Sequence, residues 1–296
     1  MRPFSSSAHL CYCFCTMKKR TLPFLGLLLL PFCTAFAQSS PQSVTLTNVA
    51  YYGEQALAGA GDYQRAQCRL DLRYPADRKG FATVVWFHGG GLQHGRRHFI
   101  DLKDPSIAVA AVGYRLSPKV KHPGYLEDAA AATAWVLSNI AQYGGDSNKV
   151  FVSGHSAGGY LSAMVGMDAR WLSPHGFSNL QLAGIAPISG QVTTHFHVKK
   201  LLGDSGPELR PLIGEFAPLY HSASNLPPIC LITGDRALEY KNRVEENALL
   251  AVSLKNLGHP RVEFYEMGGL DHGTVGEGGL IPLRNFIRRC CAPKKR

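Results

Sequence analysis

The sequence predicts an α/β domain in which a mostly parallel sheet is flanked by helices. Apolar, β-branched runs alternate along the chain with segments of helical periodicity, which is typical of βαβ units. The runs 82–87 and 150–153 are continuous rather than alternating, as expected of central parallel strands covered on both faces. A Gly-x-Ser-x-Gly pentapeptide, 154–158, follows the second run and precedes a helical segment.

Length and composition are those of a globular protein. The chain has 296 residues, of which 45% are hydrophobic and 18% charged, so it is neither a disordered chain nor a membrane-embedded one. No internal repeat, low-complexity run or linker follows residue 45, and we therefore predict a single domain after that point.

The N-terminal segment has the features of a secretory signal peptide. A basic cluster at 18–20 precedes an apolar stretch at 22–32, and Ala35-Phe36-Ala37 supplies a small-x-small cleavage site before Gln38. The apolar stretch is too short to span a bilayer. Cys33 follows Leu-Pro-Phe rather than small residues, which argues against lipidation.

These features divide the chain and predict export. Met17 stands where such a signal would begin, so residues 1–16 are interpreted as an upstream start extension. We predict a signal peptide at 17–37 and a domain over 38–296 that is periplasmic or secreted, without a stable membrane anchor.

Charge and cysteine content argue against a nucleic-acid-binding protein and against a fold built on zinc or disulfides. Residues 1–37 hold four basic and no acidic side chains, so their removal lowers the formal charge from +10 to +6. The remaining basic residues are scattered and accompany no nucleic-acid motif, so no nucleic-acid partner is expected. Four cysteines remain without a CxxC pair, which favours neither a zinc site nor a disulfide scaffold.

The elements are expected in the following order along the chain. Strands are predicted at 44–52, 68–75, 82–88, 108–115, 149–155, 182–188, 228–234 and 262–267. Helices are predicted at 125–142, directly after Ser156, at 242–257 and at 280–290. Residues 191–225 show weak periodicity and are predicted to form a small insertion, a lid or wall over the active site.

Ser156 is the candidate nucleophile. The pentapeptide Gly154-His155-Ser156-Ala157-Gly158 lies between a strand and a helix rich in small residues, where a strained strand–helix turn exposes a reactive serine. Glycines are needed on both sides because the backbone packs closely there. The strand and helix context makes this motif specific.

A glycine-rich turn at 88–91 is the candidate oxyanion hole. Attack by a serine creates a tetrahedral oxyanion, and backbone N–H groups aimed at that oxygen stabilise it. The expected donors are the N–H groups of Gly90, Gly91 and Ala157.

His272 is the candidate base, since a serine hydroxyl needs one at neutral pH. It follows the last predicted strand, where the chain order serine, acid, histidine places it. His195 and His197 form an H-x-H pair but lack a third ligand at a convincing spacing. We therefore expect a structural or pocket-lining role for them and no metal site.

Taken together, these motifs resemble those of the hormone-sensitive-lipase-like carboxylesterase branch of the α/β hydrolases. The resemblance is closest to bacterial feruloyl and acetylxylan esterases and runs from about residue 45 to the C-terminus. The segments that carry it are Trp86-Phe-His-Gly-Gly-Gly, Tyr114-Arg-Leu-Ser-Pro, Glu127-Asp-Ala-Ala-Ala-Ala, Tyr143-Gly-Gly-Asp and Gly154-His-Ser-Ala-Gly-Gly. It implies the eight-stranded α/β-hydrolase fold, hydrolysis of carboxylic esters by a Ser-acid-His triad, and no cofactor. Asp128 matches a family aspartate that we interpret as structural.

The triad acid departs from the family pattern. The resemblance places it in Gly-x-x-Asp after the strand 228–233, but Gly234-Asp-Arg-Ala puts Ala237 at that position. A carboxylate must orient the histidine and stabilise its protonated form. We predict Asp235, with Glu239 as the alternative.

Three hypotheses for the function follow. The leading one is an exported esterase that forms an acyl-enzyme on Ser156, acting on small acyl or aryl esters such as polysaccharide-linked acetyl or feruloyl groups. The second uses the same residues to hydrolyse amides, as an amidase, arylformamidase or peptidase. The third is a non-catalytic binding protein with a decayed triad, which the alanine at 237 makes worth testing.

Overall fold

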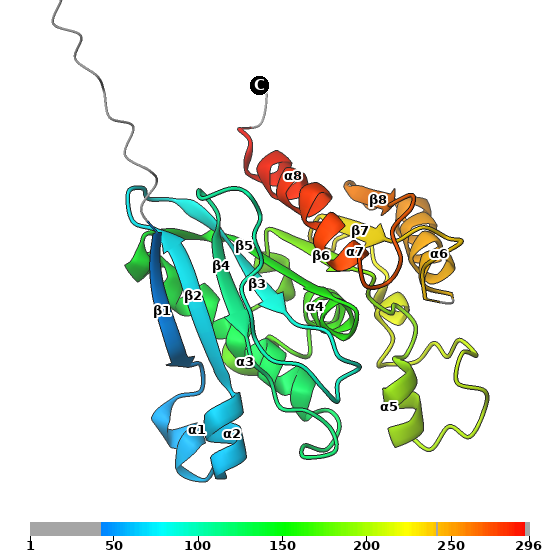
Figure 1. The fold of residues 1–296 in the computed structure, drawn as a ribbon, viewed down its shortest axis with the longest axis horizontal. Helices are drawn as coiled ribbons and strands as arrows, with labels where there is room; N and C mark the ends of the chain where they lie inside the picture. Colours follow the sequence, from blue (N-terminus) through cyan, green and yellow to red (C-terminus); the bar gives the residue numbers. More distant parts are fainter. Residues whose placement is uncertain (1–42, 241, 294–296) are drawn as a thin grey trace, which may run out of the picture. The chain divides into compact units, whose positions relative to one another are not determined.

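The computed structural model describes residues 43–240 and 242–293, and its core is one eight-stranded sheet in the order β1-β2-β4-β3-β5-β6-β7-β8 (Figure 1). All eight predicted strands are confirmed. Their bounds are Ser43–Ala50 (β1), Arg69–Pro75 (β2), Phe81–Phe87 (β3), Ala108–Val112 (β4), Gly145–His155 (β5), Gly184–Ile188 (β6), Ile229–Thr233 (β7) and Val262–Glu266 (β8).

The sheet is mixed at one end and parallel elsewhere. β1 pairs antiparallel with β2, and β2 pairs antiparallel with β4. The pairs from β4 through β3, β5, β6 and β7 to β8 are all parallel. Because parallel strands end at the same edge of a sheet, the loops that follow β3, β5, β6, β7 and β8 meet there. Every predicted site residue lies in or beside one of these loops.

Among the described residues, four α-helices correspond to the predicted ones, and four short α-helices were not predicted. The first group is α3 (Gly124–Asn139), α4 (Ala157–Met167), α6 (Arg243–Asn256) and α8 (Leu280–Cys291). α3 is shorter than predicted because residues 140–143 tighten into a 3₁₀ turn, which ends at Gly144 with φ of 96°. The short helices, too brief to show periodicity, are α1 (Glu54–Ala58), α2 (Asp62–Gln67), α5 (Phe196–Leu201) and α7 (Val275–Gly278).

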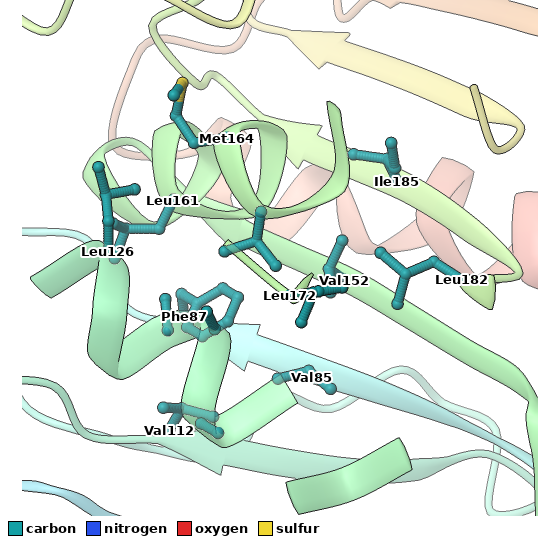
Figure 2. Packing of buried hydrophobic residues seen from close by; sticks show 14 of the residues in the cluster. Val85, Phe87, Val112, Leu126, Val152, Leu161, Met164, Leu172, Leu182 and Ile185 are labelled. Atoms are coloured by element: carbon teal, nitrogen blue, oxygen red, sulfur yellow. The ribbon is translucent and has the colours of Figure 1, made fainter. Parts of the chain in front are cut away.

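Helices cover both faces of the central strands, which explains their continuous apolar runs. On one face, Val85 and Phe87 of β3 and Val152 of β5 lie in a cluster with Leu126 of α3 and Leu161 of α4 (Figure 2). Full burial of such a side chain contributes about 1.5–3 kcal/mol. A second cluster lies on the opposite face, where α8 packs: its Phe286 ring meets the Phe151 ring edge-on at 6.0 Å.

Within residues 191–225, predicted to form an insertion, a buried ammonium group holds the short helix α5 to the loop after it. Lys199, 2% exposed, donates through Nζ to the carbonyl oxygens of Pro207, Glu208 and Arg210 at 2.6–3.1 Å. Its Nζ also lies 3.4 Å from a carboxylate oxygen of Asp204. This lysine therefore ties α5 to the loop that follows it.

The described residues, 43–240 and 242–293, belong to one compact unit. The predicted start extension at 1–16 and the predicted signal peptide at 17–37 lie outside the described residues. Within the described part of the chain, no helix combines the length and the apolarity needed to cross a membrane.

Candidate active site

Ser156 occupies a strained turn at the end of β5. Its backbone lies at φ 56° and ψ −116°, a region that residues with a side chain rarely adopt, and its N–H donates to the carbonyl of Ile188 at 2.9 Å. A Cβ at Gly154 would lie 2.5 Å from the carbonyl oxygen of Phe87, and one at Gly158 only 2.0 Å from it. The two glycines of the motif are thus required by the backbone of β3.

The loop after β8 brings His272 to this serine. Its Nε2 lies 2.9 Å from Ser156 Oγ, and its Nδ1 lies 2.6 Å from Glu239 Oε1. Since an ionised carboxylate only accepts, we assign the proton to Nδ1 and leave Nε2 as the acceptor for the serine proton. This is the arrangement of a serine–histidine–carboxylate triad.

Glu239 is held in its ionised form. Its side chain is 1% exposed, and burial opposes ionisation. Hydrogen bonds from His272 and from the backbone N–H groups of Gly234 and Tyr240 outweigh burial and lower the pKa of Glu239 to about 2. The carboxylate is therefore charged at neutral pH and able to stabilise a protonated His272.

The prediction of Asp235 as the triad acid is wrong in this geometry. Asp235 accepts hydrogen bonds from the backbone N–H groups of Ala237 at 2.8 Å and Gly269 at 2.7 Å, and none from His272. At the start of its turn, its short side chain bonds to the backbone two residues on, as Asp often does in turns. Glu239, the alternative, ends the same turn and reaches the histidine. Asp235 instead joins the two loops that carry the triad acid and the base.

Ser189 is a site residue that the sequence analysis missed. It directly follows β6 at φ 46°, donates through Oγ to Glu239 Oε2 at 2.8 Å, and lies 2.9 Å from His272 Nδ1. It therefore contacts both the acid and the base. A serine at the carboxyl end of the strand beside β5 is the signal that could have identified it.

His155, the variable residue of the motif, also positions the base. Its Nε2 lies 2.7 Å from the carbonyl oxygen of His272, and their rings lie 5.0 Å apart. Burial, together with the nearby His272, lowers the pKa of His155 to about 4. It is therefore neutral at pH 7, and its Nε2–H donates to that carbonyl.

The predicted oxyanion loop lies against the nucleophile. A Cβ at Gly89 would be 3.4 Å from Ser156 Cβ. Gly90 and Gly91 have φ of 112° and 64°, and the carbonyl of Gly90 closes the turn by accepting from two N–H groups further along the loop. Ala157 is the first residue of α4, so its N–H has no partner within that helix.

The residue before these glycines, His88, anchors the loop. Its Nδ1 lies 2.7 Å from the carbonyl of Gly89, and its ring stacks on Tyr114 at 4.3 Å. The Tyr114 hydroxyl donates to the carbonyl of His88 at 2.7 Å. Burial lowers the pKa of His88 to about 4, so it holds the loop as a neutral donor.

The H-x-H pair is buried beside the oxyanion loop and has no contact with the triad residues among the described hydrogen bonds. His195 Nδ1 accepts from the backbone N–H of His197 at 3.2 Å, and both side chains are buried. Phe196, between them, would be 3.7 Å from a Cβ at Gly91. Among the described residues, no group of three His, Cys, Asp or Glu side chains could hold a metal ion.

Asp128 has a structural environment. It is fully buried, receives hydrogen bonds from the guanidinium of Arg115 at 2.7–3.1 Å and from the Arg115 backbone N–H, and accepts from the Tyr52 hydroxyl at 2.7 Å. This network joins α3 to the segments after β1 and β4.

An open cavity of about 540 Å³ lies beside His272. Its apolar wall is formed by Leu209, Leu238 and Tyr240, and the Tyr240 ring lies 5.7 Å from the histidine ring. The histidine thus borders a space that an ester group can enter, next to partly exposed apolar side chains.

Two solved structures with a similar fold are esterases. A hyperthermophilic esterase from Pyrobaculum calidifontis aligns at 26% identity and a TM-score of 0.58, over 76% of this chain and 82% of that one. A truncated carbohydrate esterase from gut microbiota aligns at 18% identity and a TM-score of 0.64, over 86% of this chain and 98% of that one. The second likeness shows the α/β-hydrolase fold alone.

Curated relatives match a shorter stretch. Carboxylesterase NlhH of Mycobacterium tuberculosis is 38% identical over 105 residues, and the match covers 32% of each chain. The chain thus spans about a third of the length of this relative. The BD-FAE family model matches residues 70–238, which is more than half of the sequence and includes Ser156 and its oxyanion loop. The chain therefore belongs to the BD-FAE family of α/β hydrolases.

Proposed function

We propose that this protein is an exported serine carboxylesterase. The observation that carries the proposal is the hydrogen-bonded chain from Ser156 through His272 to Glu239, with the glycine loop beside the serine. The BD-FAE family and the esterases among the relatives support the same reaction.

The geometry accounts for both halves of an ester hydrolysis. Ser156 Oγ attacks the ester carbonyl while His272 Nε2 takes its proton, and ionised Glu239 stabilises the resulting imidazolium. The N–H groups of Gly90, Gly91 and Ala157 stabilise the oxyanion. His272 then protonates the leaving alcohol, and a water molecule, deprotonated by the same nitrogen, releases the acid and regenerates Ser156.

For the substrate, we propose small acyl or aryl esters linked to polysaccharide, with acetyl and feruloyl groups as the candidates. Membership of the BD-FAE family supports this class. The proposed export rests on the basic cluster, apolar stretch and cleavage site at 17–37. Mass spectrometry of the secreted protein tests it, and we expect a mature N-terminus at Gln38.

The first experiment measures hydrolysis of p-nitrophenyl acetate by protein beginning at Gln38, with Ser156→Ala as the matched control. Turnover by the wild type alone is expected, together with labelling of Ser156 by a fluorophosphonate. Equal inertness of both proteins would contradict the esterase proposal and favour a binding role. Acetic and ferulic acid release from acetylated and feruloylated xylan then tests the substrate class, with matched amides as the comparison.

A further inference from the structure

Arg243, the first residue of α6, is a buried cation that is only partly hydrogen-bonded. It is 4% exposed, and its Nε and Nη1 atoms are both buried without a hydrogen-bonding partner among the described residues. Across residues 43–240 and 242–293, no carboxylate oxygen lies within 4.0 Å of it. Buried N–H groups are almost always paired, and buried charges nearly always have a counter-ion.

The two nearest acids do not neutralise this cation. Glu239 is committed to His272 through the 2.6 Å hydrogen bond. Glu246 is buried one helical turn away, where burial raises its pKa despite the nearby guanidinium. Its carboxylate accepts a long hydrogen bond, 3.5 Å, from the backbone N–H of Thr193. Among the described residues, the guanidinium of Arg243 therefore has nearby acids but no carboxylate in direct contact with it.

Arg243 contacts one side of the proposed active site, and its charge acts on His195 on the other side. Its Cζ lies 5.9 Å from the Tyr240 ring, which is 5.7 Å from the His272 ring and lines the cavity there. On the other side, burial lowers the pKa of His195, and the charge of Arg243 lowers it further. The His195 ring stacks at 4.3 Å on Phe196, the residue beside Gly91 of the oxyanion loop.

We propose that the guanidinium of Arg243 binds a carboxylate carried by the ester substrate, close to the scissile bond. A carboxylate matches the planar fork of a guanidinium and supplies the missing negative charge. The inference rests on the proposed function, because it names a charged group on a substrate of that same site. The carboxylate belongs either to the acyl part of the ester or to the alcohol part.

Two pairs of isosteric esters separate these sources. Monomethyl glutarate and methyl glutaramate differ only in a carboxylate or a carboxamide on the acyl side, and 3-acetoxypropionate and 3-acetoxypropionamide differ likewise on the alcohol side. We expect kcat/KM of the wild type to favour the carboxylate in one pair by about tenfold or more, the gain expected of a buried charge-assisted hydrogen bond. The pair that shows the preference identifies the part of the ester that carries the carboxylate.

The variants compare this cation with Arg236, which lies in the turn between β7 and α6. Arg243→Met should abolish the preference, and Arg243→Lys should retain part of it because the charge remains without the planar fork. Arg236→Gln is the matched control. Arg236 is half exposed and already paired with Glu245 and Glu266. The Arg236→Gln variant should therefore keep the full carboxylate-to-carboxamide ratio of kcat/KM. Equal rates within both pairs in the wild type, or a preference that survives Arg243→Met, overturn the proposal.

A binding measurement tests the inference even if no ester is hydrolysed. Glutarate should raise the thermal unfolding temperature of the wild type, whereas glutaramide should not, and Arg243→Met should lose the difference. Failure to hydrolyse both the neutral esters and p-nitrophenyl acetate contradicts the proposed function alone. Absence of a glutarate-specific shift in the wild type contradicts the anion site.

Discussion

Replacing Glu239 by glutamine should abolish most of the esterase activity, whereas the parallel change at Asp235 should not. The pKa of Glu239 is about 2, against an ordinary value of 4.5. At about 1.4 kcal/mol for each pKa unit, the ionised carboxylate gains about 3 kcal/mol from its surroundings. His272 is the largest favourable contributor, and the N–H groups of Gly234 and Tyr240 supply the rest.

Electrostatics alone therefore limits the loss to about 10²-fold, since each 1.4 kcal/mol is a factor of ten. Glutamine adds a second effect. Its amide N–H₂ can donate to His272 Nδ1, which then carries no proton of its own. The imidazole proton moves to Nε2, and a protonated Nε2 cannot accept the hydroxyl proton of Ser156. The matching Asp→Asn change in a Ser-His-Asp triad lowers kcat about 10⁴-fold. We expect kcat/KM of Glu239→Gln to fall by about 10³–10⁴-fold.

Asp235→Asn should lower kcat/KM by less than about tenfold, because it weakens one of two backbone hydrogen bonds that join the loops and leaves His272 with its partner. Both variants are compared with the wild type on p-nitrophenyl acetate, and the rate of fluorophosphonate labelling gives a second readout of serine activation. A larger loss in Asp235→Asn than in Glu239→Gln would refute the assignment of the acid.

Four further outcomes are expected. Ser189→Ala removes a donor to Glu239 and should lower kcat about tenfold with little change in KM. An unchanged kcat would show that this hydrogen bond does not contribute to catalysis. Gly158→Ala places a Cβ 2.0 Å from a backbone oxygen and should cost about 3 kcal/mol or more in urea unfolding, as well as activity. Asp128→Asn removes the buried ion-pair partner of Arg115 and leaves only the more distant, exposed Glu127, so it should lower the free energy of unfolding by about 3–5 kcal/mol. Because the folded pKa of Glu239 is depressed, its carboxylate stabilises the fold fully above pH 4.5, and this contribution is lost as the pH falls to about 2. Between pH 4.5 and about 2, the free energy of unfolding of the wild type should fall by at most about 3 kcal/mol more than that of Glu239→Gln. The same pH dependence of this free energy in both proteins would contradict the prediction.

The strands were predictable because each has a strong local signal. The continuous run at 82–87 and the run before Ser156 are apolar along both faces, and helices do cover both faces of β3 and β5. The short helix α5 was not predictable. It has six residues, fewer than two turns, and is held by tertiary contacts such as those of Lys199 Nζ.

At the site, the residues in motifs with a fixed backbone geometry were predictable. Which nearby carboxylate contacts the histidine was not. Ser156 and His272 follow from strand–loop context, and the structure brings them within 2.9 Å of each other. The choice between Asp235 and Glu239 depends on where a six-residue turn aims each carboxylate, which chain order does not encode. Ser189 joins the site only because β6 lies between β5 and β7 in the sheet.

The site shows that position and side-chain length can compensate for each other. The family pattern places the acid at 237, where this chain has alanine, and Glu239 supplies it two residues later with one more methylene than an aspartate. A relative carrying carboxylates at both positions would lose neither charge nor orientation when either one mutates. The position of the acid can therefore change along this turn during evolution without loss of activity. A motif search that requires Gly-x-x-Asp would classify such enzymes as inactive.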